Sequence, residues 1–409
     1  MSNNLRNEPS LEPFVDPVRG DEEEVPSKFQ NHAINFNGNG AEYFKIWIVN
    51  LILSILTIGI YSAWAKVRTK RYFYGNTEID GAVFDYHATP IMILKGRIVA
   101  VLLFILFTAS GYFSPYAQGV LFLALALLAP WVIWNSIRFN AKVTSYRNVR
   151  FAFKGRPLKL YLLLILVPLS PALIAVLVAG VLYLVNPLQS TFLGGIVGIG
   201  IFAVYLMIPL VQQLVTSYYF GNHLYGQGTV KEKLSSGHYY ITYLKLMLLS
   251  FLWLIPIGLL IAAIAAFSGA SLTNVDPESL ASGSIGAGIG FVVFIPIILM
   301  SVWSKAYLQA RIRNYVFSKI KLADRIKFSS ELKVKRLFWI YLSNLFLLII
   351  TLGFAYPWTK IRLAKYKLET ISLLVWGDLD GFVTQMGDRR NALGEELGDA
   401  FDLDIGLGI

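Results

Sequence analysis

Eight long apolar segments constrain the fold of this chain more than any other feature of its sequence. Each approaches or exceeds the ~18–20 apolar residues with which a helix crosses a bilayer. Of the 409 residues, 56% are apolar and 15% are charged, whereas soluble domains have about 25% charged residues. The sequence therefore predicts an all-α polytopic membrane protein. Its apolar segments cover roughly residues 44–64, 92–113, 115–137, 160–185, 191–215, 243–267, 285–303 and 337–358.

The basic residues are distributed unevenly between the connections. No Lys or Arg lies between the second and third, the fourth and fifth, or the sixth and seventh segments. By the positive-inside rule, the basic connections after segments 1, 3, 5 and 7 are cytoplasmic. The net charge of +11 is therefore interpreted as a topology signal and as a surface for anionic lipid head groups, and not for nucleic acid.

The first and last segments leave the topology open. If both cross the membrane, the chain has eight spans, and the basic stretch after residue 358 lies outside, against the charge rule. If both enter the membrane and return, six segments span and both tails are cytoplasmic. Length favours spanning, and charge favours re-entry; a glycine inside each segment, Gly59 and Gly353, suits a return.

These same two segments are copies of each other. A shift of 294 residues, without a gap, superimposes NLILSILTIGIYSAWAKVRTKRY (50–72) on NLFLLIITLGFAYPWTKIRLAKY (344–366). Internal repeats are typical of membrane transport folds. The shared exit motif consists of Trp64, Lys66, Arg68 and Tyr72 in the first copy and Trp358, Lys360, Arg362 and Tyr366 in the second. Interface anchoring at the level of the lipid head groups is the simpler interpretation of these residues.

Short polar stretches after several segments predict β-hairpins on the cytoplasmic side. They lie at residues 77–88, 145–155 and 319–330, and they show alternation or an Asp-Gly turn signal. The expected plan is thus a repeated unit of apolar helix, basic-aromatic exit, small hairpin and apolar return.

Five amides lie within apolar segments: Asn50, Asn344, Asn135, Gln212 and Gln213. An amide in lipid needs a hydrogen-bond partner, so contact between helices is one interpretation and a solute pathway is the other. Asn50 and Asn344 occupy equivalent repeat positions, and we expect them near any functional centre.

Motifs for catalysis, cofactors or metals are missing from the sequence. The chain has no cysteine, its four histidines lack metal-ligand spacing, and no nucleophile or phosphate-loop motif occurs. The apolar segments contain almost no ionisable residues, which disfavours a proton-coupled carrier. We expect no enzyme activity, no cofactor and no metal.

Composition divides the chain into three parts. Residues 1–33 predict a disordered acidic arm, residues 34–370 the repeated membrane domain, and residues 371–409 a tail with an acidic end.

Several stretches resemble a known family. They include GNGAEYFKIW (38–47), LTIGIYSAWAKVRTKRYFYGNT (56–77), FDYHATP (84–90), TSYRNVRFAFKG (144–155) and GEELGDAFDLDIGL (394–407). Together they resemble the YjgN family of bacterial inner-membrane proteins. The resemblance implies a multi-pass protein of the bacterial cytoplasmic membrane and supplies no catalytic or binding residues.

Two functional hypotheses follow. The first is a transporter or channel-like protein for a small polar or anionic solute. The alternative is a structural or regulatory membrane protein that binds anionic lipid or a protein partner through its basic-aromatic cytoplasmic face.

Overall fold

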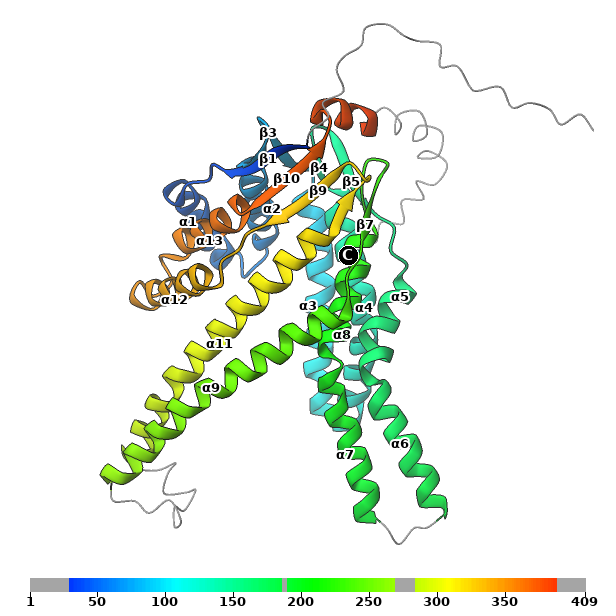
Figure 1. Ribbon diagram of the computed structural model, residues 1–409, viewed down its shortest axis with the longest axis vertical. Coiled ribbons are helices and arrows are strands. Elements are labelled where there is room, and N and C mark those ends of the chain that lie inside the picture. Colours follow the sequence, from blue (N-terminus) through cyan, green and yellow to red (C-terminus); the bar gives the residue numbers. More distant parts are fainter. Residues whose placement is uncertain (1–28, 186–189, 269–283, 388–409) are drawn as a thin grey trace, which may run out of the picture.

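Antiparallel strands close into a barrel from which the helices project (Figure 1). The structure is a computed structural model that describes residues 29–185, 190–268 and 284–387. Around the barrel the strands run in the order β1-β10-β9-β8-β7-β6-β5-β4-β3-β2. Their bounds are Phe29–Phe36 (β1), Thr77–Ile79 (β2), Ala82–Tyr86 (β3), Thr144–Tyr146 (β4), Val149–Phe153 (β5), His223–Tyr225 (β6), Gly228–Glu232 (β7), Ile320–Leu322 (β8), Ile326–Ser330 (β9) and Ile371–Trp376 (β10).

Four β-hairpins of the barrel connect successive helices: β2–β3, β4–β5, β6–β7 and β8–β9. Positive φ at Asp80-Gly81 and at Arg147-Asn148 gives the tight primed turns that suit the twist of a hairpin. The helices are α1 Gly40–Leu56, α2 Ser62–Gly75, α3 Pro90–Phe113, α4 Pro115–Lys142, α5 Pro157–Tyr161, a π-helical turn Leu162–Leu166, α6 Val167–Val185, α7 Ser190–Leu206, α8 Ile208–Gly221, α9 Ser236–Ser268, α11 Ser284–Lys319, α12 Val334–Ile350 and α13 Tyr356–Glu369.

The two ends of the described chain close the barrel. β1 and β10 pair antiparallel from Phe29↔Trp376 to Ala33↔Ser372. The two strands pair as the strands of a hairpin do, although they come from the beginning and the end of the described chain. The pairing also leaves no free sheet edge, which removes a site of edge-to-edge aggregation.

Apolar side chains fill the barrel. Along β10, Ile371, Leu373 and Val375 are buried and alternate with more exposed residues, as the two-residue period of a strand requires. A helix over residues 379–387, which we call the plug helix, covers one end (Figure 1). Its buried residues belong to the barrel core and recur at helical spacing: Leu379, Phe382, Val383 and Met386.

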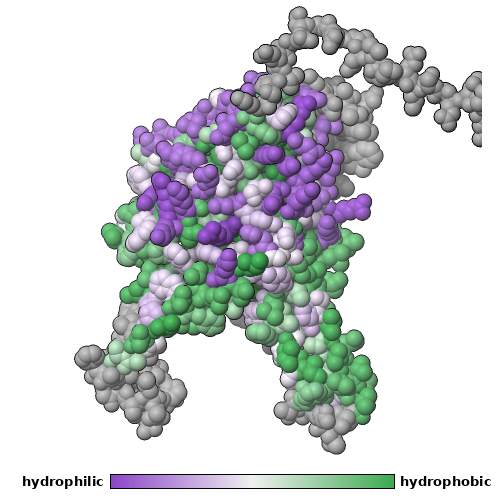
Figure 2. Space-filling view, viewed as in Figure 1, coloured by the Kyte–Doolittle hydropathy of each residue, from purple (hydrophilic) through white to green (hydrophobic). Residues whose placement is uncertain are grey.

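The long helices leave the barrel in groups that diverge away from it (Figure 1). Hydrophobic residues dominate the surface of these legs, and hydrophilic residues gather over the barrel (Figure 2). In the described residues, four helical stretches are long and apolar enough to cross a membrane, and a fifth is added if the pair of α7 and α8, bent by 42°, counts as one. The four are Pro90–Phe113, Pro115–Lys142, Pro157–Val185 and Ser236–Pro256.

The prediction of an all-α protein with about eight apolar helices is therefore wrong. The three predicted hairpins are present, but they are parts of one closed barrel together with the hairpin β6–β7 and the pair β1–β10. Strands of three to five residues carry little signal on their own, and the pairing between different hairpins is a tertiary property that periodicity does not report.

Neither the first nor the last apolar segment is a single spanning helix. The first breaks between α1 and α2, where Ile58 has φ 49° and Gly59 has φ 87°. The last breaks between α12 and α13 in the same way, with φ 49° at Leu352 and 92° at Gly353. In both turns a threonine hydroxyl, of Thr57 or Thr351, donates to a helix carbonyl four residues earlier.

Each broken segment starts and ends at the barrel. β1 precedes α1 and β2 follows α2, and these strands pair through Ile34↔Ile79. β9 and β10 flank α12 and α13 and pair through Ser330↔Ile371. The two copies are thus helical hairpins that leave the barrel and return to it.

Most of the predicted arm (1–33) and the acidic end of the predicted tail (371–409) lie outside the described residues. The described parts of the two, residues 29–33 and 371–387, contain the start of β1, the strand β10 and the plug helix. The division into an arm, a membrane domain and a tail therefore stays a prediction.

Candidate anion-binding groove

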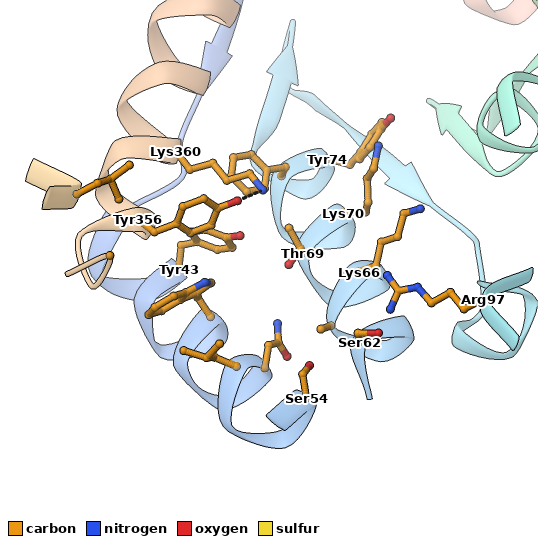
Figure 3. A pocket seen from close by; sticks show the side chains of 17 residues that line it. Tyr43, Ser54, Ser62, Lys66, Thr69, Lys70, Tyr74, Arg97, Tyr356 and Lys360 are labelled. Carbon is orange, nitrogen blue, oxygen red and sulfur yellow. Dashed lines mark hydrogen bonds between the residues drawn. The ribbon is translucent and has the colours of Figure 1, made fainter. Parts of the chain in front are cut away.

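A groove of about 920 Å³ lies where the two repeat copies meet. The helical hairpin α1–α2 forms one wall. The turn between α12 and α13, together with the start of α13, forms the other (Figure 3). α3 adds Arg97 at the edge. Asn50 and Asn344 were both expected near any functional centre, but only Asn50 lines the groove.

Four basic side chains line this groove: Lys66 and Lys70 of α2, Arg97 of α3 and Lys360 of α13. None of the described residues that line it is an Asp or a Glu. Lys360 Nζ donates to Tyr356 Oη at 3.1 Å and lies 5.6 Å from the ring centre of Phe73. Unopposed cations on a partly apolar wall attract an anion, because the low local dielectric strengthens their field.

Hydroxyl groups complete the polar lining. On α2, Ser62, Lys66 and Thr69 recur four and three residues apart, a spacing that places them on one face of a helix. α1 contributes Ser54, and Tyr43 and Tyr356 lie close to Lys360 (Figure 3). The groove thus offers both charge and neutral hydrogen-bonding groups.

The surroundings shift the pKa values of two of these lysines in opposite directions. Burial lowers the pKa of Lys66, and the positive charges of Arg97 and Lys70 lower it further. Burial also acts to lower the pKa of Lys360, but the hydrogen bond to Tyr356 and the nearby Tyr43 outweigh it, so the pKa is raised. An anion that binds beside Lys66 would offset the effect of these positive charges and favour its charged form.

Asn50 is the least satisfied polar group of the groove. Its side chain is 5% exposed, and among the described residues neither Nδ2 nor Oδ1 has a hydrogen-bond partner. Its repeat equivalent, Asn344, is 7% exposed, and there Nδ2 donates to Thr359 O at 3.2 Å. A buried polar group without a partner costs about 1–3 kcal/mol. Among the described residues Asn344 Oδ1 has no partner either, but Asn50 leaves both of its polar atoms unpaired and therefore carries the larger cost.

The tyrosines of the exit motif have a structural role. Tyr72 Oη accepts from Asn39 N at 2.8 Å and donates to Asn39 O at 3.0 Å, which ties α2 to the start of α1. In the second copy, Tyr366 Oη accepts from Lys333 N at 2.9 Å. Each tyrosine thus closes its own helical hairpin.

The other residues of the exit motif divide between the groove and the surface. Lys66 and Lys360 line the groove, whereas Arg68 is exposed and Arg362 donates to Ser343 Oγ at 2.8 Å. The Trp64 ring stacks on Tyr61, with centroids 6.1 Å apart. Trp358 packs on Phe44 at 5.1 Å, and its ring leaves no room for a side chain at Gly40.

The remaining intramembrane amides lie away from the groove. Gln212 Oε1 accepts from Tyr243 Oη at 2.8 Å, a contact between α8 and α9. Gln213 Nε2 donates to Leu234 O at 3.1 Å. Asn135 is half-buried in α4. The two glutamines therefore make contacts within the helical framework, and a pathway role for these amides stays a prediction.

Two further cavities lie beyond the groove. One, of about 480 Å³, shares Lys70 and Tyr74 with it and also contains His223, whose pKa is lowered by burial; we call it the vestibule. The other, of about 250 Å³, is the barrel cavity, which shares Phe84 and Phe151 with the vestibule and is lined by apolar and aromatic residues.

Sequence reasoning missed most of the groove. Lys70 and Arg97 were not singled out, although the polar spacing along residues 62–70 marks one helix face. In the part of the chain that the structure describes, no three His, Asp or Glu side chains come together as metal ligands. The available chemistry is that of the cations, hydroxyls and the Asn50 amide.

Comparisons with known proteins agree with this membrane architecture. Residues 31–400 match a family described as "Bacterial protein of unknown function (DUF898)". The chain is 30% identical to the inner membrane protein YjgN of Escherichia coli O157:H7 over 379 residues, 88% of this chain and 91% of the relative. It is 28% identical to the protein of that name from Salmonella typhimurium strain LT2, over 86% of this chain and 90% of the relative.

No solved structure gave a significant match. The family match covers most of the sequence, and the curated relatives are inner-membrane proteins. The chain is therefore an inner-membrane protein that belongs to the DUF898 family, together with the YjgN proteins.

Proposed function

We propose that the groove binds the head group of an anionic lipid in the cytoplasmic leaflet, and that the protein is a structural or regulatory lipid-binding protein of the inner membrane. One observation carries the proposal. Four cationic side chains face one groove, and among the described lining residues no carboxylate opposes them. A phosphate is the group that such a site stabilises best, because charge-assisted hydrogen bonds are about twice as strong as neutral ones.

The position of the groove supports a lipid over a soluble anion. The tips of both helical hairpins are apolar and bare: Ile58 is 95% exposed and Leu352 is 89% exposed. Such tips are stable only in contact with hydrocarbon. Gly353, in the second tip, lines the groove, so the groove reaches from the apolar tip to the basic residues near the barrel. An anionic lipid has this same gradient from chain to head group.

The positive-inside rule places the barrel, and with it the basic end of the groove, on the cytoplasmic side. A protein partner on the basic-aromatic face is the other form of this hypothesis. The lipid form is preferred because the cations lie in a groove beside exposed apolar tips and not on a flat polar surface.

Transport of a small polar or anionic solute is the second candidate. It is favoured by the contact between the groove and the vestibule, which share Lys70 and Tyr74. The apolar lining of the barrel cavity opposes a polar route along the barrel axis, so a solute would have to leave the vestibule between helices. Solute flux in proteoliposomes tests this candidate, and flux that depends on Lys70 would favour it over lipid binding alone.

Lipid binding is tested with the purified full-length protein in a neutral detergent. Native mass spectrometry would compare phosphatidylglycerol with phosphatidylcholine in the wild type and in the triple variant K66Q/K70Q/K360Q. We expect the variant to bind phosphatidylglycerol at least roughly tenfold more weakly, because it loses three charge-assisted contacts.

The matched control is K142Q/K154Q/K159Q, which removes the same charge from exposed positions near the barrel that do not line the groove. It should bind like the wild type. Equal losses in the two triple variants would mean that general surface charge, and not the groove, holds the lipid.

A further inference from the structure

We propose that the groove recognises a phosphate ester that carries a free hydroxyl group, and that Asn50 hydrogen-bonds this hydroxyl. The ligand class is an anionic phospholipid with a glycerol or other polyol head group. This inference rests on the proposed function, because it specifies which anionic lipid the same groove selects.

The buried side-chain amide of Asn50 requires hydrogen-bond partners. A side-chain amide offers two N–H donors and one carbonyl acceptor. In the described chain, neither its Nδ2 nor its Oδ1 finds a partner, although the side chain is almost fully buried against the groove. A ligand that satisfies this residue must therefore present an acceptor and a donor side by side.

Asn344 has the same place in the second copy. There Nδ2 is bonded to Thr359 O, the carbonyl one turn into the returning helix. The equivalent residue of Thr359 in the first copy is Ala65, which lines the groove. Among the described residues, both polar atoms of the amide are thus open in the first copy, whereas in the second copy Nδ2 is satisfied internally and Oδ1 alone has no partner.

Other head groups do not match both the cations of the groove and the amide of Asn50. A bare phosphate or a carboxylate only accepts hydrogen bonds, so it can satisfy Nδ2 but not Oδ1. An ammonium head group could donate to Oδ1, but Lys66, Lys70, Arg97 and Lys360 would repel it. A hydroxyl donates and accepts without charge. A polyol beside a phosphate therefore matches both the cations and the amide.

The expected geometry follows from the lining. The phosphate lies among the lysines of α2 and α13, and the polyol lies beside Asn50 of α1. A site with a buried amide should reject an analogue that lacks the hydroxyl, because the amide would then stay unpaired.

The test compares two lipids of equal charge, phosphatidylglycerol and phosphatidylpropanol, which lacks the head-group hydroxyls. Full-length wild-type protein should bind phosphatidylglycerol about tenfold more tightly, the effect of two hydrogen bonds that the analogue cannot make. N50L should bind both lipids equally, and N344L should keep the preference, because Asn344 does not line the groove.

The possible outcomes separate the two proposals. Equal binding of both lipids by the wild type, with both still dependent on the groove lysines, would overturn the hydroxyl inference and keep the proposed function. Because this comparison uses the wild type, it holds even if N50L fails to fold. Binding that is independent of the lysines would overturn the proposed function itself. Direct binding of soluble glycerol 1-phosphate, together with no binding of phosphatidylglycerol, would assign the groove to a soluble polyol phosphate and overturn the lipid form.

Discussion

The helical hairpins α1–α2 and α12–α13 share a backbone plan but differ in what they can bind. Both break at a left-handed turn ending in a glycine, and both are closed by a tyrosine that bonds the start of the first helix. Their faces differ at four polar positions of the first copy. Ser54, Ser62, Thr69 and Lys70 correspond to Leu348, Tyr356, Leu363 and Ala364.

The neighbours of the two copies explain this difference. Leu363 of the second copy packs in an apolar cluster with Leu337 of α12 and with Ala306 and Ala310 of α11. The first copy has α13 as its neighbour, and Tyr356 and Lys360 of that helix face the open groove. The comparison teaches that the repeat fixes the scaffold, whereas the helix packed beside it decides whether a binding site remains.

The largest expected effect comes from giving the second copy the polar residues of the first. L363T/A364K should destabilise the protein by about 2–5 kcal/mol, because Leu363 and Ala364 are half-buried in two apolar clusters and polar groups would enter both. Thermal unfolding in detergent measures this. The reverse exchange, T69L/K70A, should keep the melting temperature and weaken anionic lipid binding. A stable L363T/A364K variant would contradict the packing explanation.

The turn glycines should show that the two scaffolds are equivalent. G59V and G353V each place a β-branched side chain at φ near +90°, which costs about 1–3 kcal/mol. Nothing lies within 4 Å of a Cβ added at either glycine, so the effect is due to the backbone alone. Similar falls in melting temperature are expected, and clearly unequal falls would mean that the turns are not equivalent.

The tyrosines that close the hairpins should have smaller, matched effects. Y72F and Y366F each remove a hydroxyl that bonds the start of the preceding helix, at an expected cost of about 1 kcal/mol. Thermal unfolding of the two variants checks this. A large loss of lipid binding in Y72F without a change in stability would mean that this tyrosine belongs to the binding site.

The smallest effect concerns pH and is confined to the first copy. The pKa of Lys66 is lowered by burial and by Arg97 and Lys70, so its charge is lost at a pH below its usual value of 10.5. Since an anion binds the charged form, affinity for phosphatidylglycerol should fall as the pH rises through this lowered pKa.

In K66R the charge persists, because a guanidinium does not deprotonate in this range, and the fall in affinity should be delayed. The other titratable or charged groups that line the groove are Lys70, Lys360, Arg97, Tyr43, Tyr74 and Tyr356. An unchanged pH profile in K66R would assign the titration to one of those groups.

Part of the fold could be predicted from local sequence. The ungapped repeat at 50–72 and 344–366 and the Asp-Gly turn signal at residues 80–81 are local, and the structure contains the matching helical hairpins and β-hairpin. The hairpin β6–β7 was missed because its strands, HLY and GTVKE, show neither clear alternation nor a familiar turn pair.

The barrel itself could not be predicted in this way. Its closure depends on the pairing of Phe29 with Trp376, two residues at opposite ends of the described chain. Of the groove, the sequence indicated Asn50, Lys66 and Lys360, because these belong to the repeat, but not Lys70 or Arg97, which have no partner in it.

By itself, the sequence determined that this protein enters the membrane, that it contains repeated helical units and that its cations gather at the ends of its apolar segments. Hydrophobic length, charge at segment ends and a left-handed glycine turn are local properties that any fold of the chain must respect. Only the tertiary structure decided that the hairpins close into a barrel, and that in the described chain both polar atoms of Asn50 are unpaired while Nδ2 of Asn344 is bonded. Both depend on which strands and helices become neighbours, and packing across the whole chain determines these neighbours.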